Sequence, residues 1–446
     1  MYLKLAIRNA KRSVMDYLLY ITSMIILLTI MQISNCIAVM GKMQAGLHTT
    51  SLPVLITIIL VVLVEYMNRF MLKQRAKEFS NYLLLGMEKR KLSKMFLMEF
   101  LTIGMVCFSI SALLGFVVDT IFSSAVFPQK IKWDVGLWGK SLWQTFCYFC
   151  VVESVSGFRV KHRVDCLQIR ELMYEKQRNQ IIKNKNNYKC WSIVFAISFI
   201  CFVGLLYGIT YGTGVSVSLM ISVIAVPVLC LIFAFYQGIY GYFYAKRQVQ
   251  PESLYKGNRL YMLAQMTSDP QTNAWMNGIF CVCLCFAAAA FLMGTIMLQA
   301  DIKFFHAEGQ QWMGFLQISI CIIFLVIYFS ILALQQVIQI REEIKSLQTL
   351  YHIGKSGSQI RALVKKQLAI RLLMPLGMCF LILLAGLPLI NWRLNRIFAA
   401  SMQNIMVKSI GWFLVCFLVC YVLYFQVIYA VSRRYIEGKD AKNISW

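Results

Sequence analysis

Residues 71–96 read MLKQRAKEFSNYLLLGMEKRKLSKMF, and this stretch decides the fold. It is charged, amphipathic and helix-forming, and it lies between two runs that are apolar enough to cross a bilayer. Phe79, Tyr82 and Leu83 share one helical face. Gly86 suits the left-handed conformation that closes a helix, and the basic residues after it predict a second helix that enters the membrane. A bent, basic element of this kind at a membrane surface indicates a contact point for another subunit.

The composition around this stretch is that of a membrane protein. The chain has 446 residues, of which 59% are hydrophobic, a share that a soluble protein of this length does not carry. We therefore predict an all-α polytopic membrane protein with about ten transmembrane helices and amphipathic cytosolic coupling helices. The predicted spans are 16–40, 50–70, 96–122, 137–156, 190–211, 215–240, 273–298, 314–336, 370–392 and 409–432.

The net charge of +25 follows from topology rather than from nucleic-acid binding. When the N-terminus is placed in the cytosol, most of the 44 Lys and Arg residues fall on the cytosolic side of the predicted spans. This bias obeys the positive-inside rule and predicts that both termini are cytosolic. Basic residues near the membrane also favour anionic lipids, so membrane lipids are expected partners and nucleic acid is not.

Blocks of predicted spans alternate with polar segments. The outer loops are short, so no extracellular domain is expected from them. The predicted organisation is a cytosolic amphipathic helix at 1–15, spans one to four at 16–156 with a coupling segment at 71–95, a polar cytosolic segment at 157–189, spans five to seven at 190–298, an extracellular loop at 299–313, spans eight to ten at 314–432 with a coupling segment at 337–369, and a cytosolic tail at 433–446.

The two coupling segments resemble each other, which indicates a weak internal repeat. Both lie between a span that enters the cytosol and a span that leaves it. Two equivalent elements of this kind are suited to a symmetric pair of partner subunits. Alignment of Gly86 with Gly354 pairs Lys77 with Lys345, Phe79 with Leu347, Leu85 with Ile353, and Leu92 with Ile360.

No catalytic or metal-binding pattern stands out. Gly354-Lys355-Ser356 resembles the end of a phosphate-binding loop, but Thr349 occupies the place of the first glycine and no strand precedes it. We interpret the motif as a helix stop at Gly354 followed by a helix start that Ser356 caps. The four histidines lie in different loops, and most of the fifteen cysteines lie inside spans, where they act as small apolar residues.

A few charged residues lie within or near the predicted spans, where they are costly. Glu65 and Glu99 border the first coupling segment, and we expect them to meet basic residues of that connector such as Arg69 or Lys94. Glu153 is expected to reach toward the cytosolic surface. Acidic groups that face one another at mid-depth are not apparent, which argues against a proton-coupled carrier.

Three sequence stretches resemble FtsX-like (MacB/FtsX, type VII) ABC transporter permeases. They are LAIRNAKRS at 5–13, KEFSNYLLLGMEKRKLSKMFLMEF at 77–100 and IRELMYEKQRN at 169–179. The ten-span layout is similar to the subgroup that confers resistance to bacitracin and lantibiotic-type peptides. The resemblance implies a permease of the bacterial cytoplasmic membrane that is itself no enzyme and binds no cofactor. ATP and Mg would be bound by a separate ABC ATPase subunit, in two copies.

In such permeases, closure of the ATPase dimer moves the spans through the coupling helices. The subgroup often associates with a sensor histidine kinase, which is a second candidate partner. By position, the resemblance assigns ATPase coupling to Arg75, Glu78, Gly86, Lys89, Glu343, Lys345, Gly354 and Lys355.

One departure from the subgroup bears on the substrate. Its members carry a large extracellular domain between spans seven and eight, where this chain has only the short stretch from Met297 to Trp312. We expect a permease that exports or removes a membrane-active peptide or lipid-linked ligand, with antimicrobial peptide resistance as one outcome. The alternatives are a membrane scaffold that signals to a histidine kinase or cell-wall hydrolase, and an ion-coupled secondary carrier.

Overall fold

The computed structural model describes residues 14–45, 51–74, 76–126, 135–166, 188–211, 217–249, 258–268, 270–298, 307–397 and 405–438. All regular structure within these ranges is α-helical, which confirms the all-α prediction. The helices are α2 (Val14–Ala45), α3 (Ser51–Gln74), α4 (Ala76–Leu84), α5 (Lys89–Val126), α6 (Val135–Cys166), α8 (Tyr188–Tyr211), α9 (Val217–Val249), α10 (Arg259–Met266), α11 (Pro270–Met297), α12 (Ala307–His352), α13 (Gly357–Ile397) and α14 (Ile405–Gly438).

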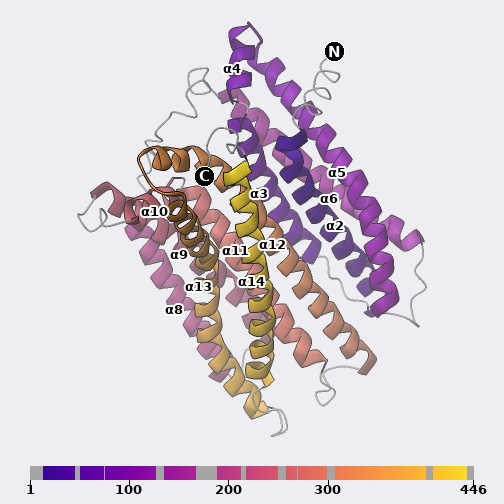
Figure 1. Ribbon diagram of the computed structural model, residues 1–446. Coiled ribbons are helices and arrows are strands. Elements are labelled where there is room, and N and C mark those ends of the chain that lie inside the picture. The colour runs from indigo at the N-terminus through magenta and orange to yellow at the C-terminus, as the bar shows by residue number, and fades with distance from the viewer. Residues whose placement is uncertain are drawn as a thin grey trace. The chain divides into compact units, whose positions relative to one another are not determined.

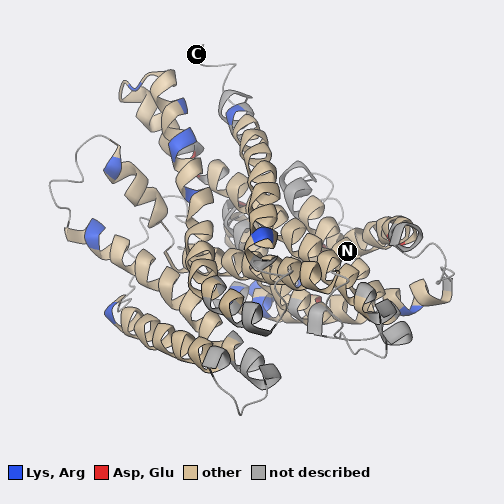
Figure 2. Cartoon of the chain, turned by 90° about the horizontal axis from the view of Figure 1, so that it is seen from below, with Lys and Arg blue, Asp and Glu red and all other residues tan. Residues whose placement is uncertain are grey.

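Over the described residues, eight helices are long and apolar enough to cross a membrane, which confirms the multi-pass class. They are α2, α5, α8, α9, α11, α12, α13 and α14. The other two predicted spans coincide with α3, whose apolar stretch is Ile56–Tyr66, and with α6, which carries charged side chains along its length. Figure 2 shows long stretches of helix without charged residues, interrupted by short segments of Lys and Arg.

The chain forms two compact units, and the first contains residues 1–181 together with 333–335. In this unit α2 packs against α3, α5 and α6, and α4 lies at the end of α5 (Figure 1). Polar side chains join α2 to α6: the Gln32 amide donates to Ser141 Oγ at 2.8 Å, and the Asn35 amide donates to Thr145 Oγ1 at 2.9 Å. Buried polar groups of this kind must be hydrogen-bonded, so these pairs fix how α2 and α6 face each other.

Glu65 forms two ion pairs that the sequence did not predict. Glu65 on α3 pairs with Arg159 and with Arg163 on α6, the latter at 3.1 Å. The expected partners were Arg69, whose side chain lies outside the described residues, and Lys94. Arg159 and Arg163 lie almost a hundred residues further along the chain than Glu65, and this pairing joins α3 to α6.

α6 extends further than its predicted span. It continues to Cys166, so the first residues of the segment predicted at 157–189 are helical. Glu153 does not reach toward the surface: it is 5% exposed, and its carboxylate packs against Gly104 of α5. A Cβ atom at Gly104 would lie 2.5 Å from Glu153 Oε1, so the glycine makes room for this buried carboxyl group.

The second unit contains residues 182–332 and 336–446. α9 packs against α8, α10 and α11, while α13 packs against α8, α11 and α14. Pro375 lies inside α13, and the Tyr236 hydroxyl of α9 lies 3.1 Å from the carbonyl oxygens of both Met374 and Pro375. The N–H that Pro375 lacks would have bonded the carbonyl of Arg371, one turn earlier, so the Tyr236 hydroxyl does not replace that bond. It instead adds a hydrogen bond from α9 to the backbone of α13 beside the proline.

Candidate functional site

The turn between α4 and α5 is a closed helix end of defined geometry. Gly86 has φ of 90°, a left-handed conformation that glycine adopts without strain. Its N–H donates to Leu83 O at 3.1 Å, and the Met87 N–H donates to Tyr82 O at 3.0 Å. These two bonds make a Schellman motif. The predicted helix stop at Gly86 is therefore confirmed, and α5 begins three residues later.

The turn between α12 and α13 has the same geometry. Gly354 has φ of 103°, its N–H donates to Tyr351 O at 2.9 Å, and the Lys355 N–H donates to Leu350 O at 3.2 Å. The side chain of Ser356 and that of Gln359 each accept a bond from the other's backbone N–H at 3.4 Å, which forms a capping box at the start of α13. The interpretation of this motif as a helix stop and a capped start is thus confirmed.

Behind each turn lies a small apolar core built from equivalent positions. In the second unit its buried members are Leu347, Ile360, Leu363 and Val364. In the first unit the residues 268 positions earlier are also buried, namely Phe79, Leu92, Met95 and Phe96. The Phe79 and Phe96 rings meet edge to face with centroids 5.6 Å apart. The repeat inferred from sequence is therefore visible as matching burial around two matching turns.

At the tip of each turn the repeat places an exposed apolar side chain. Leu85 is 84% exposed and Ile353 is 76% exposed, and each directly precedes the left-handed glycine. Both turns lie at the ends of helices and outside the apolar mid-sections. A large apolar side chain held out on a rigid turn is a common feature of surfaces that bind another protein.

The left-handed glycines predict a specific pattern of tolerance to substitution. No atom lies within 4 Å of a Cβ built at Gly86 or Gly354, so only backbone strain opposes a side chain there. We expect Gly86→Val and Gly354→Val each to lower the free energy of unfolding by about 1–2 kcal/mol relative to Asn at the same position, because Asn tolerates this conformation. Thermal unfolding midpoints of the four variants test this, and equal midpoints for Val and Asn would contradict it.

The predicted coupling residues fall into two groups in the structure. Glu78, Gly86, Lys89 and Gly354 are exposed at or near the turns. Lys355 and Glu343 lie behind the second turn instead: Lys355 Nζ bonds Asn258 Oδ1, and Glu343 is 4% exposed. Arg75 lies outside the described residues, as does the side chain of Lys345.

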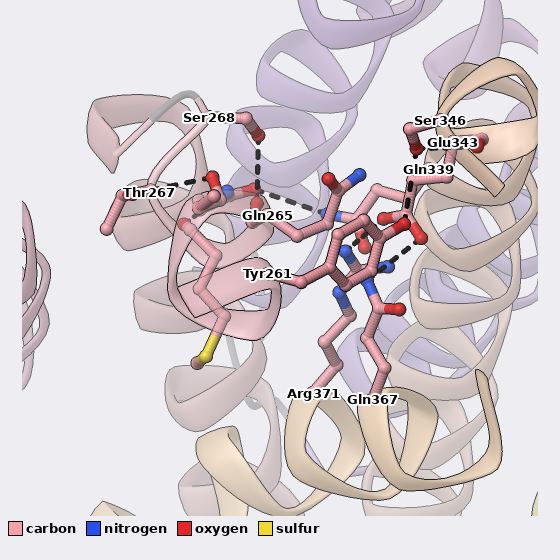
Figure 3. Close-up of polar contacts among 12 residues, drawn as sticks. Tyr261, Gln265, Thr267, Ser268, Gln339, Glu343, Ser346, Gln367 and Arg371 are labelled. Carbon is pink, nitrogen blue, oxygen red and sulfur yellow. Dashed lines mark hydrogen bonds and ion pairs between the residues drawn. The ribbon is translucent and has the colours of Figure 1, made fainter. Parts of the chain in front are cut away.

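Glu343 is the centre of a polar network that joins α12 to α13 (Figure 3). Its carboxylate pairs with Arg371 and accepts a hydrogen bond from Gln367 Nε2 at 2.9 Å. Ser346 Oγ donates to the Glu343 carbonyl at 2.7 Å, so the Tyr261 hydroxyl, 3.2 Å from Ser346 Oγ, donates to Ser346. Burial raises the pKa of the Tyr261 phenol.

Sequence reasoning did not find the partners of Glu343 and Lys355. Arg371 is a charged residue within the apolar span predicted at 370–392, and an intramembrane charge of this kind signals a buried partner. Asn258 and Tyr261 lie on or beside α10, a helix of eight residues. No motif distinguishes them in the sequence, and only their contacts with the second turn show their place in the site.

Comparison with known families identifies one part of the chain. Residues 50–151 match the family model described as FtsX-like permease C-terminal. This range contains α3, α4, the turn at Gly86, α5 and the first half of α6. A search among curated proteins gave no match. Between residues 50 and 151, therefore, the chain is similar to the C-terminal part of FtsX-like permeases.

Proposed function

We propose that this chain is the membrane subunit of an ABC transporter and that a separate ATPase subunit drives it. The observation that carries the proposal is the repetition of one turn in both units, with the same backbone bonds, the same buried positions and the same exposed apolar tip. An ATPase dimer offers two equal surfaces, and two equal docking turns on one chain are suited to such a partner. The family match around the first turn supports this proposal.

Each turn is joined directly to a long helix that enters the apolar region. α5 begins at Lys89 and runs for 38 residues, and α13 begins at Gly357 and runs for 41 residues. A helix transmits displacement along its axis because its backbone bonds are all made within it. Movement of the ATPase subunits would therefore reach the spans through these two helices.

In this proposal some of the residues near the turns contact the ATPase subunit, and others hold the turn in position. The exposed tips Leu85 and Ile353 would anchor the ATPase subunit, with Glu78 and Lys89 near the first tip. Glu343 and Lys355 would hold the second turn in shape from behind. The ATPase subunit would bind ATP and Mg, and both turns and both chain termini would face the cytosol.

The proposed work is export or removal of a membrane-active peptide or a lipid-linked ligand. Large apolar side chains are exposed along α5, α8 and α14, as expected for helices that face lipid. A ligand dissolved in the membrane could therefore meet the spans without an extracellular capture domain. A sensor histidine kinase is a further proposed partner, and signalling without transport remains the competing function.

The test is to reconstitute the chain in lipid nanodiscs with an ABC ATPase subunit encoded beside it. We expect a stable complex with two ATPase copies per chain, and ATP turnover that differs from that of the ATPase subunit alone. Failure to form a complex, or ATP turnover that does not change when the chain is present, would overturn the proposal. A Lys366→Ala variant, changed at an exposed lysine on α13, serves as a control that should behave as the unmodified chain.

A further inference from the structure

We infer that α10 is a strut that links the α12–α13 turn to the C-terminal end of α9, with Asn258 and Tyr261 as its positioning residues. This inference deepens the proposed function, because it assigns to α10 the passage of movement from the second docking turn to a helix that does not itself adjoin that turn in sequence. It rests on contacts at both ends of α10, all within the second unit.

The first contact joins α10 to the turn itself. Lys355 directly follows the left-handed Gly354, and its Nζ bonds Asn258 Oδ1. Asn258 is the N-cap residue of α10, yet its side chain makes no capping bond. An asparagine at this position usually caps its own helix. Here its oxygen is used by the docking turn, so the start of α10 is fixed by the turn rather than by its own cap.

The second contact lies along the face of α10. The Tyr261 hydroxyl bonds Ser346 on α12, as Figure 3 shows. The Tyr261 and Met262 side chains also pack against the apolar core behind the turn, which has members from both sides of it. Leu347 comes from α12 and Ile360 from α13, so α10 packs against a core to which both helices joined by the turn contribute.

The third set of contacts joins the other end of α10 to its neighbours. Arg247 near the end of α9 donates to Thr267 Oγ1 at 3.2 Å and to Ala264 O at 3.5 Å. Asn273 of α11 donates to Met266 O at 3.2 Å. Thr267 is completely buried, so its end of the bond with Arg247 is shielded from water.

Within the part of the chain that the structure describes, these contacts are the main ones that position α10. It has eight residues and no fully buried one, and a helix this short is marginal in water on its own. The groups at its two ends and on its face therefore contribute to its order. A displacement of the turn would move the start of α10 through the bond between Lys355 and Asn258. Because the helix moves as a unit, its other end would shift against Arg247.

The first test uses the full-length chain alone in nanodiscs and measures hydrogen–deuterium exchange of amides in 258–268 and 243–249. Lys355→Ala should speed exchange in both segments by about tenfold, the factor expected for the loss of one charge-assisted hydrogen bond. Lys355→Arg retains a donor and should stay close to the unmodified chain, and so should the exposed control Lys366→Ala. Unchanged exchange in both segments of the Lys355→Ala variant would overturn the strut.

The second test adds the ATPase subunit. Its binding should slow exchange at the turn, in 350–360, and also in 258–268. In the double variant Asn258→Ala with Tyr261→Phe, binding of the ATPase subunit should still slow amide exchange at the turn. It should no longer slow amide exchange in 258–268. Equal slowing of 258–268 in this variant would overturn the strut. If the ATPase subunit slows exchange at the turn in no variant, the result counts against the proposed function. The inference that α10 is a strut is then decided by the first test, on the chain alone.

Discussion

Replacement of Leu85 and Ile353 together by aspartate is expected to abolish binding of the ATPase subunit while the chain stays folded. Both side chains are mostly exposed in the free chain, so neither contributes to its core. Burial of one such side chain in a partner's pocket contributes about 1.5–3 kcal/mol, and a buried carboxylate without a partner adds a further cost. Each single change should therefore weaken binding by at least tenfold.

The double aspartate variant should lose far more affinity for the ATPase subunit than either single variant. A dimeric partner that engages both turns gains from the second contact without a second association step, and this gain disappears when both tips are lost. Co-purification and a titration of the labelled ATPase subunit measure the effect. Leu85→Met with Ile353→Leu is the matched control, because it keeps apolar volume at each tip and should retain binding. Undiminished binding of the double aspartate variant would show that the tips are not the anchors.

The turns at Gly86 and Gly354 could be predicted from sequence because their signals are local. Gly86 and Gly354 each follow an amphipathic stretch, and the left-handed end of a helix selects glycine on steric grounds alone. The apolar spacing on either side of each glycine then fixes which residues form the core behind the turn. That is why the pairing of Phe79 with Leu347 and of Leu92 with Ile360 survives in the structure as matching burial.

The ion pairs could not be predicted, because their partners are brought together only by helix packing. Glu65 could pair with any nearby basic residue on the evidence of sequence spacing, and the choice of Arg159 and Arg163 depends on α3 packing against α6. Glu153 shows the same limit. Its position near a helix end suggested an exposed carboxylate, but Gly104 on another helix leaves room for it inside the unit.

The buried pair of Glu343 and Arg371 carries the largest expected effect on stability. Glu343 is 4% exposed and the Arg371 side chain is 12% exposed, so little water reaches either charge. Arg371→Met would leave the carboxylate buried with only Gln367 as a described donor to it. Removal of one member of a buried ion pair costs about 3–5 kcal/mol, because the remaining charge is left without compensation.

Neutralisation of both members should restore most of that loss. In the double variant Glu343→Gln with Arg371→Met, the new amide oxygen can still accept the bond from Gln367, and no uncompensated charge remains. Thermal unfolding can be followed with a thiol-reactive fluorophore once the exposed cysteines have been blocked in the folded chain, since Cys281 and Cys283 are fully buried in the folded second unit. The midpoint should fall sharply for Arg371→Met, recover in the double variant and stay unchanged for the exposed control Lys366→Met. If Arg371→Met unfolds at the original midpoint, then the apolar core behind the turn, rather than this ion pair, holds α12 against α13.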